Sequence, residues 1–156
     1  MFESSVLAPP FTRESAIQKV RISENAWNER NPEKIILGYT KDCTWRGRSK
    51  FLQGREAVED YLRQKWNSEQ DYRVIKELWT FGDNRIAIRF QYEWHNNSGL
   101  WFRSCGAELW EFNEEGFICK REASVNDLII SEEERRFLWP LGSRPEDHPG
   151  LLGLGL

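Results

Sequence analysis

The sequence predicts one α+β domain shaped like a cone, in which a curved antiparallel sheet wraps over helices from the N-terminal part of the chain. Two observations predict this class. Apolar residues recur with helical spacing up to about Trp66, and from there to about Asp127 they alternate with polar residues in aromatic-rich runs. The 156 residues are enough for one well-buried core and too few for two ordinary domains. We therefore assign 1–156 to a single domain, with a Pro/Gly-rich tail from about residue 140.

Helices are expected in three segments before the sheet. The first begins with Thr12 as its N-cap, after a Pro-Pro pair, and ends near Arg30, before an Asn-Pro pair. The second is short, 32–39, and opens with a proline, and the third covers 54–67. Apolar residues with helical spacing mark the inward faces of the first and third helices: Ala16, Ile17, Val20 and Trp27, and Val58, Tyr61, Leu62 and Trp66.

Two polar residues, Ser23 and Glu24, fall on the edges of the inward face of the first helix. A helix edge is more often a solvated border than the wall of a pocket, so a pocket role is the less frequent outcome for Glu24. Ser23 is kept as a candidate pocket residue.

Strands are expected from residue 43 onward. The clearest alternation lies in 84–94, where one face would be buried and the other would face water. A loop is expected over 49–53, and after the sheet a Ser-Glu-Glu-Glu sequence from Ser131 predicts a short capped helix. The expected strands are 43–48, 72–81, 84–94, 100–112 and 117–127.

The last strand carries charges on the face that should be buried. Its odd positions are expected to point inward, because most of them are apolar or small: Phe117, Cys119, Ala123 and Val125. Arg121 and Asp127 lie on the same face, and they would then be charged groups inside the cone.

A carboxylate on the preceding strand should face the same interior. If 113–116 form a four-residue loop, Glu108 pairs with Arg121 across the hairpin and points inward beside Trp110. A slip of one residue in this register would turn both charges outward. Small residues on the same face would leave room for a ligand: Ser104 and Gly106.

A buried pair of Glu108 and Arg121 has two interpretations. It could be a structural ion pair with little net stabilisation, because desolvation nearly cancels the attraction. Alternatively, Arg121 binds an anionic or carbonyl oxygen of a ligand and Glu108 acts as general acid or base. A raised pKa of Glu108 would favour acid–base work, and a lowered pKa would favour a closed salt bridge. Glu77 could join the pair if the odd positions of strand 72–81 face inward.

The eight tryptophans favour an aromatic-walled cavity for a small, partly apolar molecule. In the alternative, these rings simply fill the cone. On the opposite face of the sheet, Trp101 and Leu109 would form an apolar patch, which predicts a homodimer through that face. The remaining candidate pocket-lining residues are aromatic: Trp27, Trp45, Trp66, Trp79, Phe90, Tyr92 and Trp110.

Composition argues against several function classes. The net charge of -3 leaves no positive excess for nucleic acid. Residues 1–12 lack a basic and apolar leader, and no segment approaches the roughly 20 apolar residues of a membrane span, so a cytoplasmic protein is expected. Three cysteines without a Cys-x-x-Cys motif predict free thiols. The two histidines, His95 and His148, lie outside the expected site, so no metal and no cofactor are expected.

Several short segments carry a family resemblance: WRGR from residue 45, GREA from 54, WEFN from 110, KELW from 76, FRS from 102, NDL from 126 and WPLG from 139. The first three, with the order of elements, resemble the nuclear transport factor 2-like superfamily, which includes SnoaL-like polyketide cyclases, ketosteroid isomerase, scytalone dehydratase and limonene epoxide hydrolase. The whole set looks like a bacterial and fungal domain-of-unknown-function family within that superfamily. The resemblance implies a cystatin-like cone and commonly a homodimer.

The resemblance places Glu108 at the strand position where ketosteroid isomerase carries an acid that polarises its substrate carbonyl. The base of that enzyme falls near Gly47 and its tyrosine near Ser23, so its chemistry does not transfer. Two functions stay open. One is a cofactor-independent isomerase, dehydratase or hydrolase, with Glu108 as acid or base and Arg121 as oxyanion anchor. The other is a non-catalytic ligand-binding or dimerisation module.

Overall fold

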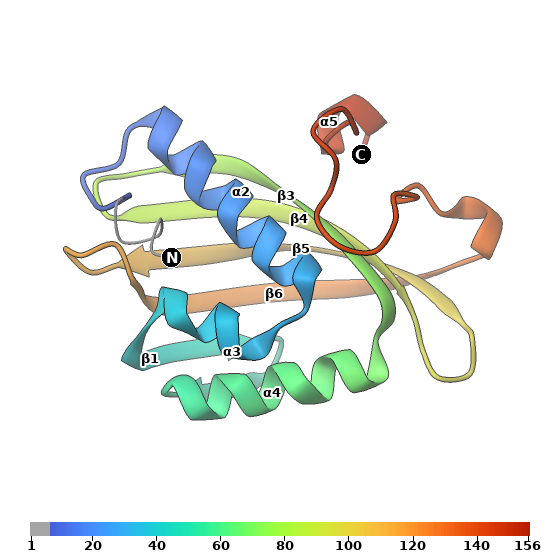
Figure 1. Ribbon diagram of the computed structural model, residues 1–156, viewed down its shortest axis with the longest axis horizontal. Helices are drawn as coiled ribbons and strands as arrows, with labels where there is room; N and C mark the ends of the chain where they lie inside the picture. Colours follow the sequence, from blue (N-terminus) through green and yellow to red (C-terminus); the bar gives the residue numbers. More distant parts are fainter. Residues whose placement is uncertain (1–6) are drawn as a thin grey trace.

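The computed structural model describes residues 7–156; residues 1–6, part of the segment in which no leader is expected, lie outside this range. The helices are α2 Arg13–Glu29, α3 Pro32–Ile35, the 3-10 turn η1 Ile36–Gly38, α4 Arg55–Ser68, the 3-10 turn η2 Glu132–Glu134 and α5 Leu151–Leu154. The strands are β1 Tyr39–Gly47, β2 Lys50–Gln53, β3 Gln70–Phe81, β4 Arg85–His95, β5 Trp101–Phe112 and β6 Ile118–Ile130. They form one curved sheet in the order β2-β1-β6-β5-β4-β3, with α2, α3 and α4 on one face (Figure 1). The predicted α+β cone is confirmed.

One pairing in this sheet is parallel. Strands β1 and β6 run in the same direction, with Trp45 opposite Arg121, whereas the other neighbouring strands are antiparallel. A parallel pair needs a long connection, and here α4 and the four strands β2 to β5 supply it. The parallel pair brings the residues of β1 beside the inward charge of the last strand.

The helices begin and end close to the predicted positions. The hydroxyl of Thr12 accepts a bond of 3.1 Å from the Ser15 amide, and the Ser15 hydroxyl accepts one of 2.9 Å from the Thr12 amide. Helix α2 ends at Arg30, which has a left-handed backbone with φ of 54°. At the other end of the chain, Ser131 and Glu134 form the predicted capping box, although the helix is only a 3-10 turn.

The loop expected over 49–53 is wrong, because Lys50–Gln53 forms strand β2. This strand pairs with β1 in a tight hairpin and lies at the edge of the sheet. Four residues are too short a run to show alternation, and three of the four are exposed. Strand β1 is also longer than expected and begins at Tyr39.

The register of the last hairpin differs from the prediction by two residues. Arg121 lies opposite Trp110 and Ala123 lies opposite Glu108. The loop is one residue longer than expected, since Phe112 pairs with Ile118, and a bulge at Cys119 adds one more. Because the side-chain period of a strand is two, this even shift leaves Glu108 and Arg121 on the inner face.

The inner face of β3 is the opposite of the predicted one. Tyr72, Val74 and Lys76 point into the cone, so Glu77 and Trp79 lie on the outer face and their inward assignment is wrong. Glu77 accepts a bond from Arg89 of β4, and the Trp79 side chain is exposed. Ile75, also on the outer face of β3, is covered by the C-terminal tail. A second small core forms there: Ile75, Phe137, Trp139 and Leu151.

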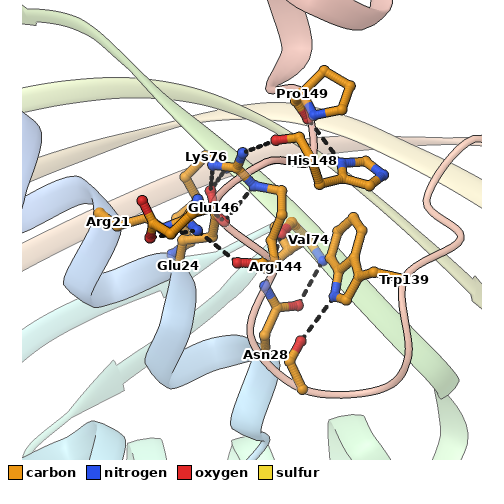
Figure 2. A network of polar contacts seen from close by, with 11 residues as sticks. Arg21, Glu24, Asn28, Val74, Lys76, Trp139, Arg144, Glu146, His148 and Pro149 are labelled. Carbon is orange, nitrogen blue, oxygen red and sulfur yellow. Dashed lines mark hydrogen bonds and ion pairs between the residues drawn. The ribbon is translucent and has the colours of Figure 1, made fainter.

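The C-terminal tail is fastened to α2 by Glu24, whose side chain is fully buried (Figure 2). Its carboxylate accepts a bond of 2.8 Å from Arg144 of the tail, one of 3.1 Å from Arg21 and one of 2.9 Å from the backbone amide of Lys76. Glu24 therefore joins the tail, α2 and β3, and its place is structural.

Candidate functional site

Three charged side chains from three strands meet inside the cone. The Glu108 carboxylate of β5 accepts a bond of 2.9 Å from Arg121 Nε of β6, and its other oxygen lies 3.1 Å from Lys76 Nζ of β3. Trp110 Nε1 donates to the same carboxylate at 2.7 Å. The three charged residues are buried, with 2%, 4% and 5% exposure for Glu108, Arg121 and Lys76. Loss of one partner of such a buried ion pair is strongly destabilising, because water cannot reach the charge that is left behind.

Indole rings surround the two cations. The Arg121 guanidinium lies 4.2 Å from the ring of Trp45 and 5.0 Å from that of Trp27. Lys76 Nζ lies 4.5 Å from the ring of Trp27 and 5.5 Å from that of Trp110. Aromatic faces attract cations at such distances, and part of the cost of burying the two charges is offset in this way.

The charges shift the pKa values of the site in opposite directions. Burial would raise the pKa of Glu108, but Arg121 and then Lys76 outweigh it and hold that pKa at about 2. Burial lowers the pKa of Lys76 to about 8, although Glu108 acts against this shift. Near neutral pH, Glu108 is therefore ionised, and Lys76 is the group of this cluster that exchanges a proton most readily.

One donor of the cluster has no acceptor. Arg121 Nη1 is buried and makes no hydrogen bond to any of the described residues. A buried guanidinium N–H without a partner is costly, and such groups in proteins are normally met by a water or a ligand atom.

Arg121 also lines a cavity of about 30 Å³, which is room for about one water. Its walls come from β1, β3, β4, β5, β6, α2 and α4, and Trp27, Trp45, Phe90 and Tyr92 line it with Glu108, Arg121 and Lys76. The cone is thus largely filled by its own side chains around the charged cluster.

The solvent side of the cavity is closed by two long cations. Arg48 donates to Asp127 at 2.6 Å, and Lys65 donates to Glu69 at 2.7 Å. Both also reach the hydroxyl of Tyr92, at 3.4 and 3.3 Å. The side chains of Arg48 and Asp127 are each 35% exposed, so this pair lies at the surface and can rearrange more freely than the buried cluster.

Three further candidates lie around the cavity without lining it. Ser23 accepts a bond of 3.0 Å from Lys76 Nζ. Trp110 binds Glu108 as described above, while its ring forms the wall of a separate groove. Trp66 packs edge-on against Trp27, with ring centroids 5.6 Å apart, and it supports the wall from behind.

Four candidates do not have the expected place. The space beside Gly106 is filled, since an added Cβ would lie 2.1 Å from the carbonyl oxygen of Ser124. Ser104 is buried, but its hydroxyl binds Asp127 and Trp94, and it is not among the lining residues of the cavity beside Glu108. Asp127 lies at the exposed end of the sheet, because β6 leaves the cone before this residue. Cys119 forms the bulge, where its thiol donates to the carbonyl of Glu111.

Residues 9–138 match the family described as "Protein of unknown function (DUF1348)". The chain belongs to this family. No curated protein matches the sequence.

Solved structures similar to this DUF1348 chain have the nuclear transport factor 2-like fold. SalBIII, an epoxide hydrolase/cyclase-like enzyme in pyran ring formation in polyether salinomycin, has 15% identity and a TM-score of 0.62, over 73% of this chain and 93% of that one. A nuclear transport factor 2-like protein of unknown function from Exiguobacterium sp. 255-15 has 15% identity and a TM-score of 0.61, over 71% and 98%. A protein with a ketosteroid isomerase-like fold from Catenulispora acidiphila DSM 44928, in complex with trimethylamine, has 19% identity and a TM-score of 0.59, over 72% and 85%. Identities this low show the fold alone.

The sequence prediction for this DUF1348 chain missed the cationic residues of the site, Lys76, Arg48 and Lys65. Strand β3 is apolar on both faces, so its alternation could not show that Lys76 points inward. The two others lie at the end of β1 and on α4, and only the parallel pairing of β1 with β6 brings Arg48 to the cavity.

Other observations concern metals, thiols and membranes. Within residues 7–156, no three His, Cys, Asp or Glu side chains come together in a way that could hold a metal ion. The three cysteines are free thiols, as predicted. In the same part of the chain, no helix has both the length and the apolar character needed to cross a bilayer.

Proposed function

We propose that the cavity binds the oxygen-bearing end of a small, partly apolar molecule on Arg121 and that Lys76 transfers a proton to or from it. The observation that carries this proposal is the buried Arg121 Nη1, which has no acceptor among the described residues and belongs to a side chain that lines a cavity walled by indole rings. A carbonyl or carboxylate oxygen supplies the missing acceptor, and the rings suit an apolar or aromatic body.

Lys76 replaces Glu108 as the acid–base group in this proposal. With a pKa of about 2, Glu108 is too weak a base and too rarely protonated to exchange protons near neutral pH. Lys76, with a pKa of about 8, is close to the range in which a general base works best. Glu108 then has a positioning role, because it holds both cations through its two oxygens.

The reaction class that fits is proton abstraction from a carbon next to a carbonyl. The neutral amine of Lys76 takes the proton, and the electron pair of the C–H bond forms the C=C bond of an enolate. The negative charge moves to the oxygen, where Arg121 Nη1 donates a hydrogen bond. Return of the proton to another atom of the same molecule completes an isomerisation without a cofactor.

Room for the molecule has to come from the solvent side. The cavity holds about one water, so a ligand displaces the side chains of Arg48 and Lys65 as it enters. Both side chains are long and flexible, and Arg48 is partly exposed, so a change of their rotamers is enough to displace them.

The fold of the similar solved structures supports a cavity that binds a small molecule. One of them is described as an epoxide hydrolase/cyclase-like enzyme, and another was solved in complex with trimethylamine. These descriptions are consistent with a nuclear transport factor 2-like interior that holds small molecules in this chain as well.

The test measures exchange of the α-protons of 2-tetralone in deuterated water by NMR. The proposal predicts saturable exchange that rises with pH through about 8 and levels above it, because the base is active only when deprotonated. Lys76→Met should abolish it, and Arg121→Met should slow it by about 100-fold, as expected for a lost oxyanion donor. Lys120→Met, which removes an exposed cation from outside the cavity, is the matched control. Exchange by Lys76→Met at the wild-type rate would contradict the proposal.

The non-catalytic alternative has its own support. The lowered pKa of Glu108 is the outcome expected for a closed salt bridge with Arg121 and not for acid–base work by this carboxylate. A molecule that binds to the wild type and not to Arg121→Met, with no change in exchange, would assign this function.

A homodimer through the outer sheet face also stays a proposal. Leu109 and Leu128 are each 57% exposed there. Trp101, which was expected to form part of that patch, is buried and lies under the guanidinium of Arg135 at 4.0 Å, so it offers no free surface. Sedimentation of Leu109→Arg against the wild type tests the dimer. A cytoplasmic location likewise stays a prediction from the sequence.

A further inference from the structure

A second and larger hollow lies on the other side of Trp27 from the cavity. This α2 groove is lined by α2, the α3–η1 segment and the neighbouring ends of β5 and β6. Figure 1 shows how α2, α3 and these two strands are arranged. Its volume is about 690 Å³, within the usual range of roughly 300–1,000 Å³ for small-molecule sites. Apolar side chains from all of these elements line it, among them Ile22, Ala26, Leu37, Phe112 and Phe117.

The α2 groove is separate from the charged cluster. Trp27 lines both hollows, and the ring of Trp110 and the side chain of Ser23 stand on the groove side of the same wall. Those two residues bind Glu108 and Lys76 through the wall, at 2.7 and 3.0 Å. A molecule in the groove would therefore touch the back of the cluster and would not reach Arg121.

The charges that line the α2 groove are mainly positive. Lys19, Lys34 and Arg55 line it, and Glu29 is the one carboxylate among the described lining residues. Glu29 is paired with Lys34 at 2.9 Å on the exposed rim. Arg55 donates twice to the neutral carbonyl of Tyr39, at 2.9 and 2.6 Å, so its charge is not cancelled by that partner.

Two of these cations mark one end of the groove. Arg55 reaches the backbone of Tyr39 and Lys19 reaches the carbonyl of Gly116 at 2.8 Å, and Tyr39 is paired with Ile118 where β1 and β6 begin. The positive end thus lies over the start of these two strands. The apolar walls extend from there along α2 toward Trp27.

From this arrangement we infer that the α2 groove binds an apolar carboxylate, with its head group at the Arg55 end and its hydrocarbon part against α2. Burial of hydrocarbon supplies the affinity, and the positive lining selects an anion over a neutral or cationic molecule.

Calorimetric titration with straight-chain carboxylates tests this inference. Affinity should rise about fourfold for each added methylene between hexanoate and decanoate, as the burial of one methylene predicts. Decanoate should bind more tightly than 1-decanol, and decyltrimethylammonium should not bind. Equal affinity for decanoate and 1-decanol would overturn the inference, as would no binding of decanoate at millimolar concentration.

Variants locate the binding. Ala26→Trp fills the groove and should abolish decanoate binding, and Leu37→Trp does the same from a position that is 58% exposed and tolerant of a larger side chain. Ile17→Trp, on the same helix but outside the groove, is the matched control and should bind as the wild type does. Arg55→Gln should weaken decanoate by about tenfold and leave 1-decanol unchanged. Unchanged decanoate binding in both tryptophan variants would overturn the inference.

A second copy of the chain is the competing occupant. Sedimentation of the Ala26→Trp and Leu37→Trp variants decides this, because a groove filled by another copy would give dimeric wild type and monomeric variants. That result would overturn the small-molecule inference, and an unchanged oligomeric state together with lost decanoate binding would support it.

Discussion

Two buried carboxylates of this protein, Glu93 and Glu108, differ in what they bind. Glu93 is fully buried, and it accepts the backbone amides of Arg136 and Phe137 and a bond of 2.6 Å from Arg103. Among residues 7–156, the donors to Glu108 are side chains, those of Arg121, Lys76 and Trp110. Backbone donors fix a segment of chain, whereas side-chain donors around a cavity can change partners. Burial of a carboxylate by itself therefore does not identify a functional site, and the kind of donor is the better guide.

Loss of Glu93 should have the largest effect. In Glu93→Leu the free energy of unfolding should fall by about 3–5 kcal/mol, because the amides of Arg136 and Phe137 and the Arg103 guanidinium lose their buried acceptor. Urea unfolding followed by tryptophan fluorescence measures it. Glu111→Leu removes a surface pair with Arg85 and should cost about 1 kcal/mol or less. Similar losses in both variants would show that the backbone donors of Glu93 add no more stability than a surface ion pair does.

The fall in the free energy of unfolding at acid pH should depend on the protonation of Glu108. Its folded-state pKa of about 2 lies below the unfolded value of about 4.3, so its contribution is complete above that unfolded value and is lost as pH falls toward 2. The size is on the order of 2–3 kcal/mol. Unfolding free energies between pH 5 and pH 2.5 should fall more steeply in the wild type than in Glu108→Gln. Parallel curves would show that Glu108 is not held by its cations.

Replacement of Arg144 should destabilise the C-terminal tail more than the rest of the protein. In Arg144→Met the stability should fall by about 1–2 kcal/mol, since Glu24 keeps Arg21 and the Lys76 amide as donors. Hydrogen exchange should increase mainly in 137–156. Glu146→Gln, at a side chain that is 96% exposed, serves as the control and should change nothing. An equal increase in hydrogen exchange throughout the tail and the sheet would mean that the tail does not unfold as a separate unit.

The smallest effect is expected at the rim of the cavity. Asp127→Asn weakens a pair with Arg48 in which each side chain is 35% exposed, so the free energy of unfolding should change by less than about 1 kcal/mol. Thermal unfolding measures this change. A loss as large as that in Glu93→Leu would show that the rim is part of the rigid structure and not a movable side of the site.

The sequence predicted the cone, the helices and the inward direction of Glu108 and Arg121, because alternation in β5 and β6 is clear. It did not predict the face of β3, since Ile75 and Trp79 look as inward as Val74 and Leu78 until the tail is known to cover the outside. Lys76 was missed for the same reason. The space beside Gly106 also depends on a neighbour, the backbone of β6, which no local pattern reveals.

The bulge at Cys119 lies in β6 between the hairpin turn and the buried Arg121. On its turn side Phe112 faces Ile118, and on its other side Glu111 faces Lys120. Removing this single residue would leave an unbroken ladder with every later side chain on its present face, whereas a deletion anywhere beyond it would reverse inside and outside. Variation in the length of this hairpin can therefore be absorbed at one position while Glu108 and Arg121 keep their contact.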